Sequence, residues 1–227
     1  MGQIQAYGET HGTLERVDTD GDGELDAILY TPDADFSGRA SFDYAPRDEH
    51  GAERVTGAPV VIDVMALNDA PELSAPQTQS TDEDHPLQVT GVSVSDVDAS
   101  LGGVGLMASH GTLTLGDTAG LLMLEGLGTG QVVLVGELAE VNEALAGLRY
   151  RPDANFNGSA TIELLATDLG QSGEGGEQTD TATIALTVNA VNDAPEPRAA
   201  HSLTAEDTAP LHPSGDSVAD VEAVEGD

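Results

Sequence analysis

The sequence predicts an all-β protein built from tandem Greek-key β-sandwich repeats, with one short helix near 137–148. Two observations lead to this prediction. Short runs rich in Val, Ile, Leu and Thr alternate with clusters of Gly, Asn, Asp and Pro, which is typical of short strands joined by turns. Several motifs also recur in the same order along the chain, as expected for a repeat architecture.

The recurring motifs have consistent spacing. The string YTPDADFSG at 30–38 returns as YRPDANFNG at 150–158, 120 residues later. The string LNDAP at 67–71 returns as VNDAP at 191–195, 124 residues later, and the four additional residues fit a longer loop at 169–176. Several matches in one order indicate that a structural unit recurs.

Pro71 and Pro195 mark the expected repeat boundaries, because proline lacks a backbone N–H donor and ends a strand. The string TDED at 81–84 and its counterpart TAED at 204–207 agree with this, since each stands early in a new repeat. The expected division is a partial repeat over 1–71, a complete repeat over 72–195 and the start of a third over 196–227.

Within the repeats, runs of β-forming residues predict strands. These runs lie at 15–17, 27–30, 60–64, 87–90 continuing past Gly91 into 92–94, 159–167 and 181–188. One segment differs, because Leu138, Val141, Leu145 and Leu148 have helical spacing. We expect a short helix there that covers the core.

The charge of the chain excludes several classes of partner. It contains 41 acidic and 7 basic residues, a formal net charge of −34. Such a chain repels nucleic acid phosphates and anionic lipid headgroups, and no apolar run approaches the length of a membrane span. We therefore expect neither a nucleic acid partner nor direct membrane insertion. Crowded carboxylates also oppose folding, so bound divalent cations or a high-salt environment should relieve their repulsion.

The patterns of known catalytic sites are not found. There is no cysteine, which excludes disulfide and thiolate chemistry. The six histidines have no metal-binding spacing, and there is no nucleophile elbow, phosphate loop or basic patch. His11 and His110 each precede Gly-Thr-Leu and are expected to be turn residues. We predict that the chain is not an enzyme.

The repeated motif Tyr-x-Pro-Asp-Ala-Asn/Asp-Phe-x-Gly, with VNDAP, SDVDA at 95–99 and HGTLTL at 110–115, resembles bacterial cadherin-like tandem repeats. Those repeats occur in large secreted or surface-attached adhesins. The resemblance covers nearly the whole chain and implies a cadherin- or immunoglobulin-like sandwich in an extracellular or cell-surface location. It also implies calcium ions and neighbouring repeats of the same chain as partners, and a host or matrix glycan or protein as a further one.

The resemblance implies two sets of calcium ligands. The first set comprises Asn68, Asp69, Asp96, Asp98 and Asp168. The second set comprises Glu83, Asn192, Asp193, Asp220 and Glu222. The first repeat shows no early-strand glutamate and the chain has no Leu-Asp-Arg-Glu motif, so we expect one or two ions per junction rather than three.

Physical chemistry supports calcium at the Asp-x-Asp segments independently. In an extended segment both carboxylates lie on one side, because side chains alternate with a period of two. Two carboxylates about 4–5 Å apart repel by roughly 3–4 kcal/mol at an effective dielectric of about 20. A hard cation that prefers oxygen ligands turns this repulsion into attraction. A turn role stays open for each aspartate, since Asp and Asn also favour turns.

A further acidic segment at 18–26, DTDGDGELD, matches the start of an EF-hand-type loop. Its candidate ligands are Asp18, Asp20, Asp22, Glu24 and Asp26. Position 12 of such a loop is Leu29 rather than Glu, and strands are expected on both sides. The segment is therefore expected to be a hairpin tip that either binds calcium weakly or forms a polar turn.

Three functional classes fit these patterns. The first is a calcium-dependent structural or adhesive extender of a bacterial surface or secreted adhesin, in which calcium stiffens the linkers between repeats. The second is a module that binds a glycan or a protein, and the third is an accessory region of a larger secreted enzyme. A halophilic origin with incidental calcium would also account for the charge. The N-terminus has no signal-peptide pattern, and we expect the chain to be a fragment of a longer protein.

Overall fold

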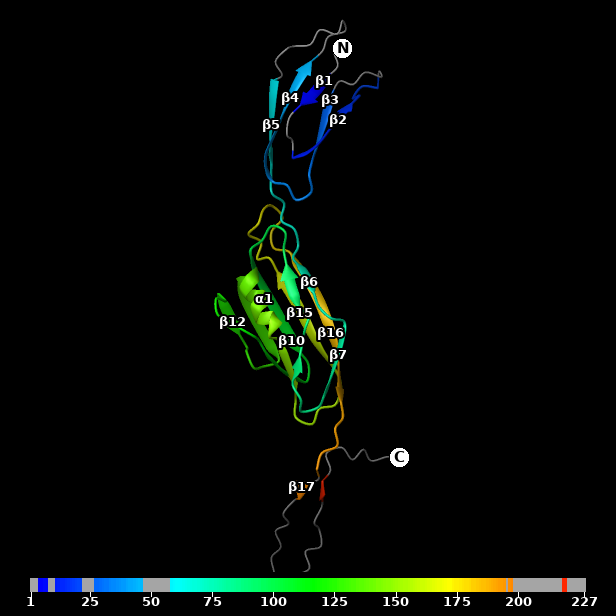
Figure 1. The fold of residues 1–227 in the computed structure, drawn as a ribbon, viewed down its shortest axis with the longest axis vertical. Coiled ribbons are helices and arrows are strands. Elements are labelled where there is room, and N and C mark those ends of the chain that lie inside the picture. The colour runs from blue at the N-terminus through cyan, green and yellow to red at the C-terminus, as the bar shows by residue number, and fades with distance from the viewer. Residues whose placement is uncertain are drawn as a thin grey trace, which may run out of the picture. The chain divides into compact units, whose positions relative to one another are not determined.

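The computed structural model describes residues 4–7, 11–21, 27–46, 58–194, 196–197 and 218–219. The chain divides into two compact units (Figure 1). The first unit consists of Met1–Glu72 together with Ser95–Gly102 and Thr167–Asp180. The second consists of Leu73–Val94, Gly103–Ala166 and Thr181–Asp227.

The prediction of an all-β sandwich with one helix is confirmed in the described residues. The early strands are β1 Ile4–Tyr7, β2 Gly12–Val17, β3 Ala27–Pro32, β4 Gly38–Pro46, β5 Ala58–Val64, β6 Glu72–Ser74, β7 Thr78–Asp82, β8 Leu87–Gln88 and β9 Ser93–Ser95. They are followed by β10 Leu101–Ala108, β11 Gly111–Thr114, β12 Met123–Glu125, β13 Gln131–Glu137, α1 Leu138–Ala146, β14 Arg149–Pro152, β15 Gly158–Thr167, β16 Thr179–Asn189, β17 Glu196–Pro197 and β18 Val218–Ala219.

In the first unit, strands β1, β4 and β5 form a three-stranded sheet and β2 pairs with β3. Ala40 and Phe42 of β4 are buried, whereas the alternate residue Ser41 is exposed, as the period of a strand requires. The exposed face carries an ion pair at 3.2 Å between Arg39 Nε and Asp63 Oδ1. This face therefore combines charged residues with the exposed Val61.

The large sheet of the second unit has the strand order β12-β13-β10-β15-β16-β7, and strands β11, β14 and β8 form a smaller sheet. The buried side chains come from alternate positions of these strands, including Val104, Leu134, Ile162 and Ile184. Strand β7 joins the edge in parallel with β16. The core is thus built mainly of aliphatic side chains, with the fully buried Tyr150 among them.

The predicted helix is confirmed as α1, whose Val141, Ala144 and Leu145 are buried. It ends at Gly147, where a Cβ atom would lie 2.1 Å from Gly116 Cα. A glycine is needed at Gly147 because the backbone of another segment passes so close. Figure 1 shows α1 lying alongside the sheet that contains β10 and β15.

One strand prediction is wrong in detail, because the run expected from 87 to 94 does not continue through Gly91. Strand β8 pairs with β14, whereas β9 pairs with β6. Gly91 lies between them with a φ of 81°, a conformation that glycine adopts without steric cost. The chain therefore turns at Gly91 and passes to a different sheet.

The repeated Tyr-Pro-Asp motif forms the same local structure twice. The Tyr150 hydroxyl donates to the His110 carbonyl at 2.7 Å, and the Tyr30 hydroxyl donates to the His11 carbonyl at 3.1 Å. Each histidine stacks on the phenylalanine of its motif, with ring centroids 4.2 Å apart for His110 and 4.6 Å apart for His11. Both histidines have a positive φ, so their predicted turn role is confirmed. The tyrosine and phenylalanine of the motif, with the histidine that they contact, therefore serve the fold.

Candidate metal centre

The first predicted ligand set lies in the first unit, where three segments supply its members. Asn68 and Asp69 follow strand β5, Asp96 and Asp98 follow β9, and Asp168 follows β15. Asn68 and Asp168 are buried, whereas Asp69 and Asp98 are exposed. Residues far apart in the sequence therefore share one polar region.

Asn68 and Asp168 form the buried half of this region, with exposed fractions of 2% and 1%. The Asn68 Nδ2 donates to Asp168 Oδ2 and, at 2.8 Å, to the Gly176 carbonyl. Because both neighbours are acceptors, the amide must present its nitrogen to them. This orientation leaves Asn68 Oδ1 buried and without a hydrogen-bond partner in the described part of the chain.

The protein holds Asp168 in its ionised form. Burial raises the pKa of this carboxyl. Hydrogen bonds from the Gln178 N–H, the Asn68 side chain and the Gly170 N–H together lower the pKa by more than burial raises it, so the net pKa lies below the usual value. The Gly170 and Gln178 amides donate to Asp168 Oδ1 at 2.8 and 2.9 Å. A permanent negative charge therefore lies next to Asn68.

The linker is the segment that follows strand β5 and includes residues 66–69. The glycine-rich loop between β15 and β16 holds this linker in place. The Asn68 N–H donates to the Glu174 carbonyl at 2.8 Å, and the Glu174 N–H donates to the Ala66 carbonyl at 3.0 Å. Gly173 has a φ of 140°, and a Cβ there would lie 2.8 Å from the Ala66 carbonyl oxygen. Sequence reasoning assigned this loop no role beyond its extra length, although its run of glycines was the signal of a close backbone approach.

The Asp-x-Asp segment combines a turn with a group of carboxylates. Asp96 Oδ1 accepts hydrogen bonds from the N–H groups of Asp98 at 3.0 Å and Ala99 at 2.9 Å, which is the turn role that the sequence left open. Asp96 Oδ2 is buried and has no partner among the described residues. Asp98 Oδ2 accepts from the Asp69 N–H at 3.3 Å, which connects the linker to this turn.

The carboxylates of this segment interact unfavourably. Desolvation, followed by a side-chain hydrogen bond with Asp96, raises the pKa of the Asp98 carboxyl; the Asp69 N–H lowers it, and the negative charges of Asp96 and Asp69 add smaller increases. A cleft of about 210 Å³ lies beside these groups and is lined in part by Asp35, Asp69 and Asp98. Asp35 was not among the predicted ligands, and its place in the repeated motif was the signal that the sequence offered.

The donor chemistry of this region fits a hard cation. Carboxylate, amide and backbone carbonyl oxygens are the ligands that calcium prefers, and Asn68 Oδ1 and Asp96 Oδ2 are buried oxygens without a hydrogen-bond partner among the described residues. Within those residues, however, no three His, Cys, Asp or Glu side chains come together as a metal-binding group. The arrangement is a polar cluster with two unpaired oxygens rather than a closed carboxylate cage.

The second predicted set is described only in part. Glu83 is 1% exposed, and its Oε1 accepts from the Val191 N–H at 2.6 Å, at the start of the second linker. The exposed Asn192 donates from Nδ2 to the Asp193 carbonyl at 3.0 Å. Asp220 and Glu222 lie outside the described residues. Ligation by this set stays a prediction.

Strands β2 and β3 form a hairpin in which Val17 pairs with Ala27, and the acidic segment at 18–26 is the stretch of sequence that connects them. Asp18 Oδ1 accepts from the Asp20 N–H at 3.2 Å and from the Gly21 N–H at 2.7 Å, which makes the described part a polar turn. The remaining candidates Asp22, Glu24 and Asp26 lie outside the described residues. Calcium binding at this tip stays untested.

No family model matches the sequence, and no curated protein matches it. The chain is similar to the solved human mucin-like protocadherin EC1-2, with 19% identity, a TM-score of 0.38, and coverage of 84% of this chain and 85% of that one. For human CDH23 EC21-23 the values are 13% identity, a TM-score of 0.38, and coverage of 86% and 60%. For protocadherin gamma B2 cadherin domains 1-5 they are 15%, 0.40, and coverage of 87% and 34%.

The chain spans less than two thirds of the length of the latter two proteins. At these TM-scores the likeness assigns no function, and the fold rests on the chain's own strand pairing and core. In the described segments no helix combines the length and the apolar character needed to cross a membrane.

Proposed function

We propose that the chain is a calcium-dependent structural and adhesive extender of a bacterial cell-surface or secreted adhesin, in which calcium stiffens the linker between repeats. The observation that carries this proposal is the pair of unpartnered buried oxygens, Asn68 Oδ1 and Asp96 Oδ2. A buried polar atom without a partner is costly. A cation bound at this cluster would give such an oxygen a partner.

The electrostatics of the cluster support a divalent ion in particular. The chain carries a formal net charge of −34, and the pKa of Asp98 is raised partly by its acidic neighbours. A calcium ion near Asp96 and Asp98 would remove this repulsion, and the ionised Asp168 would add further negative charge. The resident partners would then be calcium and the adjoining repeats, in an extracellular or cell-surface location.

The linker contacts indicate how an ion would change the mechanics of the chain. The loop at 169–178 already bonds to the linker backbone on one side through Glu174 and Asn68. On the other side, the Asp69 N–H makes a single contact with Asp98, at 3.3 Å. Calcium bound to Asp96 and Asp98 would strengthen this weaker side and fix the linker from two directions.

A calcium titration by calorimetry, with melting curves in parallel, tests this proposal. Asp96→Asn should weaken calcium binding and reduce calcium-induced stabilisation. Asp117→Asn is a matched control, because Asp117 Oδ1 also accepts a hydrogen bond two residues along, from the Ala119 N–H at 2.9 Å, but it lies in the second unit. If NaCl at equal ionic strength stabilises the protein as much as calcium does, the acidic surface reflects salt adaptation and the proposal fails.

A further inference from the structure

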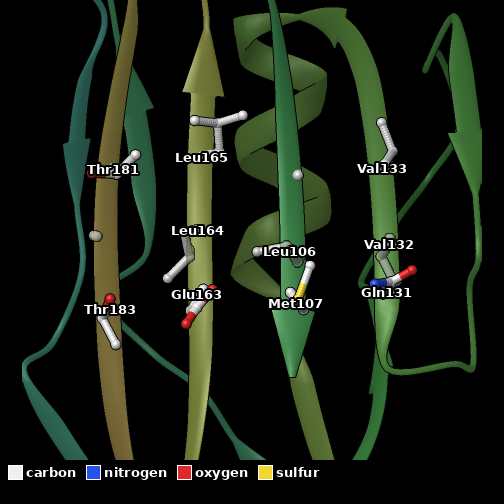
Figure 2. Close-up of a pocket in the computed structure, with 12 residues that line it drawn as sticks. Leu106, Met107, Gln131, Val132, Val133, Glu163, Leu164, Leu165, Thr181 and Thr183 are labelled. Atoms are coloured by element: carbon white, nitrogen blue, oxygen red, sulfur yellow. The ribbon is translucent and has the colours of Figure 1, made fainter. Parts of the chain in front are cut away.

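The outer face of the large sheet in the second unit carries an apolar groove (Figure 2). The groove has a volume of about 470 Å³ and crosses strands β10, β13, β15 and β16. Its exposed apolar side chains are Met107, Val133 and Leu165, with exposed fractions of 49%, 40% and 46%. Outward positions of an antiparallel sheet are ordinarily polar, so the fold alone does not account for these residues.

The hollow arises at Gly105. A Cβ atom built at this residue would have no other atom within 4 Å, so the space above the strand is open. Figure 2 shows Met107, on the same strand, between Glu163 of β15 and Gln131 of β13. The space is in the range of small ligand pockets, and an inserted aliphatic side chain could reach the backbone at Gly105.

The negative charge around the groove favours a cationic partner. The residues that line the groove lie between positions 105 and 183, and one of them, Glu163, is charged. Glu125 lies on the same face, because it pairs directly with Val133. An anionic partner would be repelled, and so would a second copy of a chain with a net charge of −34. None of the lining residues is aromatic, so a sugar ring would find no stacking surface.

The corresponding face of the first unit has a different character. There the exposed positions of β4 and β5 include Ser41, Asp43 and the Arg39–Asp63 ion pair. Val61, which is 53% exposed, lies on this face beside these polar and charged residues, so the described part of the face is mixed rather than apolar. Two of the chain's four methionines, Met107 and Met123, are exposed on the grooved face, and methionine is common on surfaces that adapt to a peptide.

We propose that this groove binds a basic segment of a partner protein, with an aliphatic side chain above Gly105 and a cationic side chain beside Glu163. The attraction is apolar burial combined with charge pairing. The groove residues take no part in the candidate metal centre, so the two proposals fail or stand separately. An anionic or purely apolar segment would lack one of the two attractions.

NMR titration of the full chain with the peptide KLLLK, amidated and acetylated, tests the proposal in 150 mM NaCl. This salt concentration limits long-range attraction to about 8 Å. We expect shifts of the Met107, Val133 and Leu165 methyl signals and a Kd of about 1 mM or below. The peptide ELLLE should not bind because its charge is reversed, and KSSSK should not bind because it lacks the apolar anchor.

Variants separate the groove from general charge attraction. Gly105→Val should weaken KLLLK binding about tenfold by filling the hollow, without unfolding, because a Cβ at this position meets no atom within 4 Å and valine favours strands. Glu163→Gln should weaken binding about threefold. Val133→Thr should also weaken KLLLK binding. Val61→Thr, at an exposed valine of the first unit, is its control and should leave binding unchanged.

Four results would overturn the proposal. These are no binding of KLLLK, equal binding of ELLLE or KSSSK, unchanged affinity in Gly105→Val, or concentration-dependent dimerisation that Gly105→Val abolishes. The last result would assign the face to a second copy of the chain.

Discussion

Replacing Asn68 by alanine tests the link between the loop at 169–178 and the linker. The substitution removes two hydrogen bonds that Nδ2 donates, one to the ionised Asp168 and one to the Gly176 carbonyl. A hydrogen bond to a charged group contributes about 1.5–3 kcal/mol and a neutral one about 0.5–1.5 kcal/mol. Because the substitution also removes the unpartnered Oδ1, which offsets part of this loss, we expect Asn68→Ala in EGTA to lower the free energy of unfolding of the first unit by at most about 2–4.5 kcal/mol.

The chain contains a matched control in Asn192, which occupies the same place in the second Asn-Asp-Ala-Pro string. Asn192 is exposed, and its side chain donates to the neighbouring Asp193 carbonyl. Asn192→Ala should cost less than about 1 kcal/mol.

Chemical denaturation measures the free energy of unfolding of Asn68→Ala and of Asn192→Ala, and hydrogen exchange reports local opening. In Asn68→Ala, the Gly170 and Gln178 amides, which donate to Asp168, should exchange faster. Equal stability losses in the two variants would refute the reasoning, because the buried environment of Asn68 would then contribute nothing.

Three further predictions concern backbone strain, pH and charge. Gly173→Ala should destabilise the first unit by about 1–3 kcal/mol, because Gly173 has a φ of +140° and the new Cβ would meet the Ala66 carbonyl oxygen. Gly176→Ala should cost less in the same denaturation assay, because Gly176 has a φ of 74° and open space around its Cβ position. Burial and the charge of a nearby aspartate raise the pKa of Tyr150 from 10.0 to about 12, so the folded state holds this proton more tightly than the unfolded state does. The stability that this difference contributes, about 2–3 kcal/mol at most, is lost as pH rises from 10.0 to about 12. Denaturation at several alkaline pH values checks this, and a pH dependence equal in Tyr150→Phe would contradict it. Asp98→Asn should raise the melting temperature in EGTA, since it removes a carboxylate whose charged form is disfavoured by desolvation and, to a smaller extent, by its acidic neighbours. It should lower calcium affinity in calorimetry; an unchanged affinity would exclude Asp98 as a ligand.

Local features of the fold were predictable because they depend on residues close together in the chain. The spacing of Leu138, Val141 and Leu145 predicted α1, and the two strands around the acidic tip at 18–26 predicted the β2–β3 hairpin. The turn role of His11 and His110 followed from their repeated position. Each signal lies within one or two elements, where backbone preference and side-chain periodicity act directly.

The candidate metal centre was predictable in its members but not in its structure. The repeated strings and the Asp-x-Asp segment identified Asn68, Asp96 and Asp98, yet their spacing does not say which oxygens other groups already satisfy. Hydrogen bonds that span about a hundred residues orient the Asn68 amide and leave its Oδ1 unpartnered, whereas the pKa of Asp168 is lowered by the nearby Gln178 and Gly170 amides as well as by Asn68. Asp35 was missed because its approach to Asp69 and Asp98 depends on the path of another loop.

By itself, the sequence determined that this chain is an acidic, all-β protein with recurring motifs, because composition and periodicity are properties of short segments. Tertiary structure alone decided that two identical Asn-Asp-Ala-Pro strings have different environments, with Asn68 buried beneath a glycine-rich loop and Asn192 exposed. It also decided that Gly105, Met107, Val133 and Leu165 form one groove. The physical reason is that burial and hydrogen-bond satisfaction depend on neighbours in space, and those neighbours come from strands and loops far apart in the sequence.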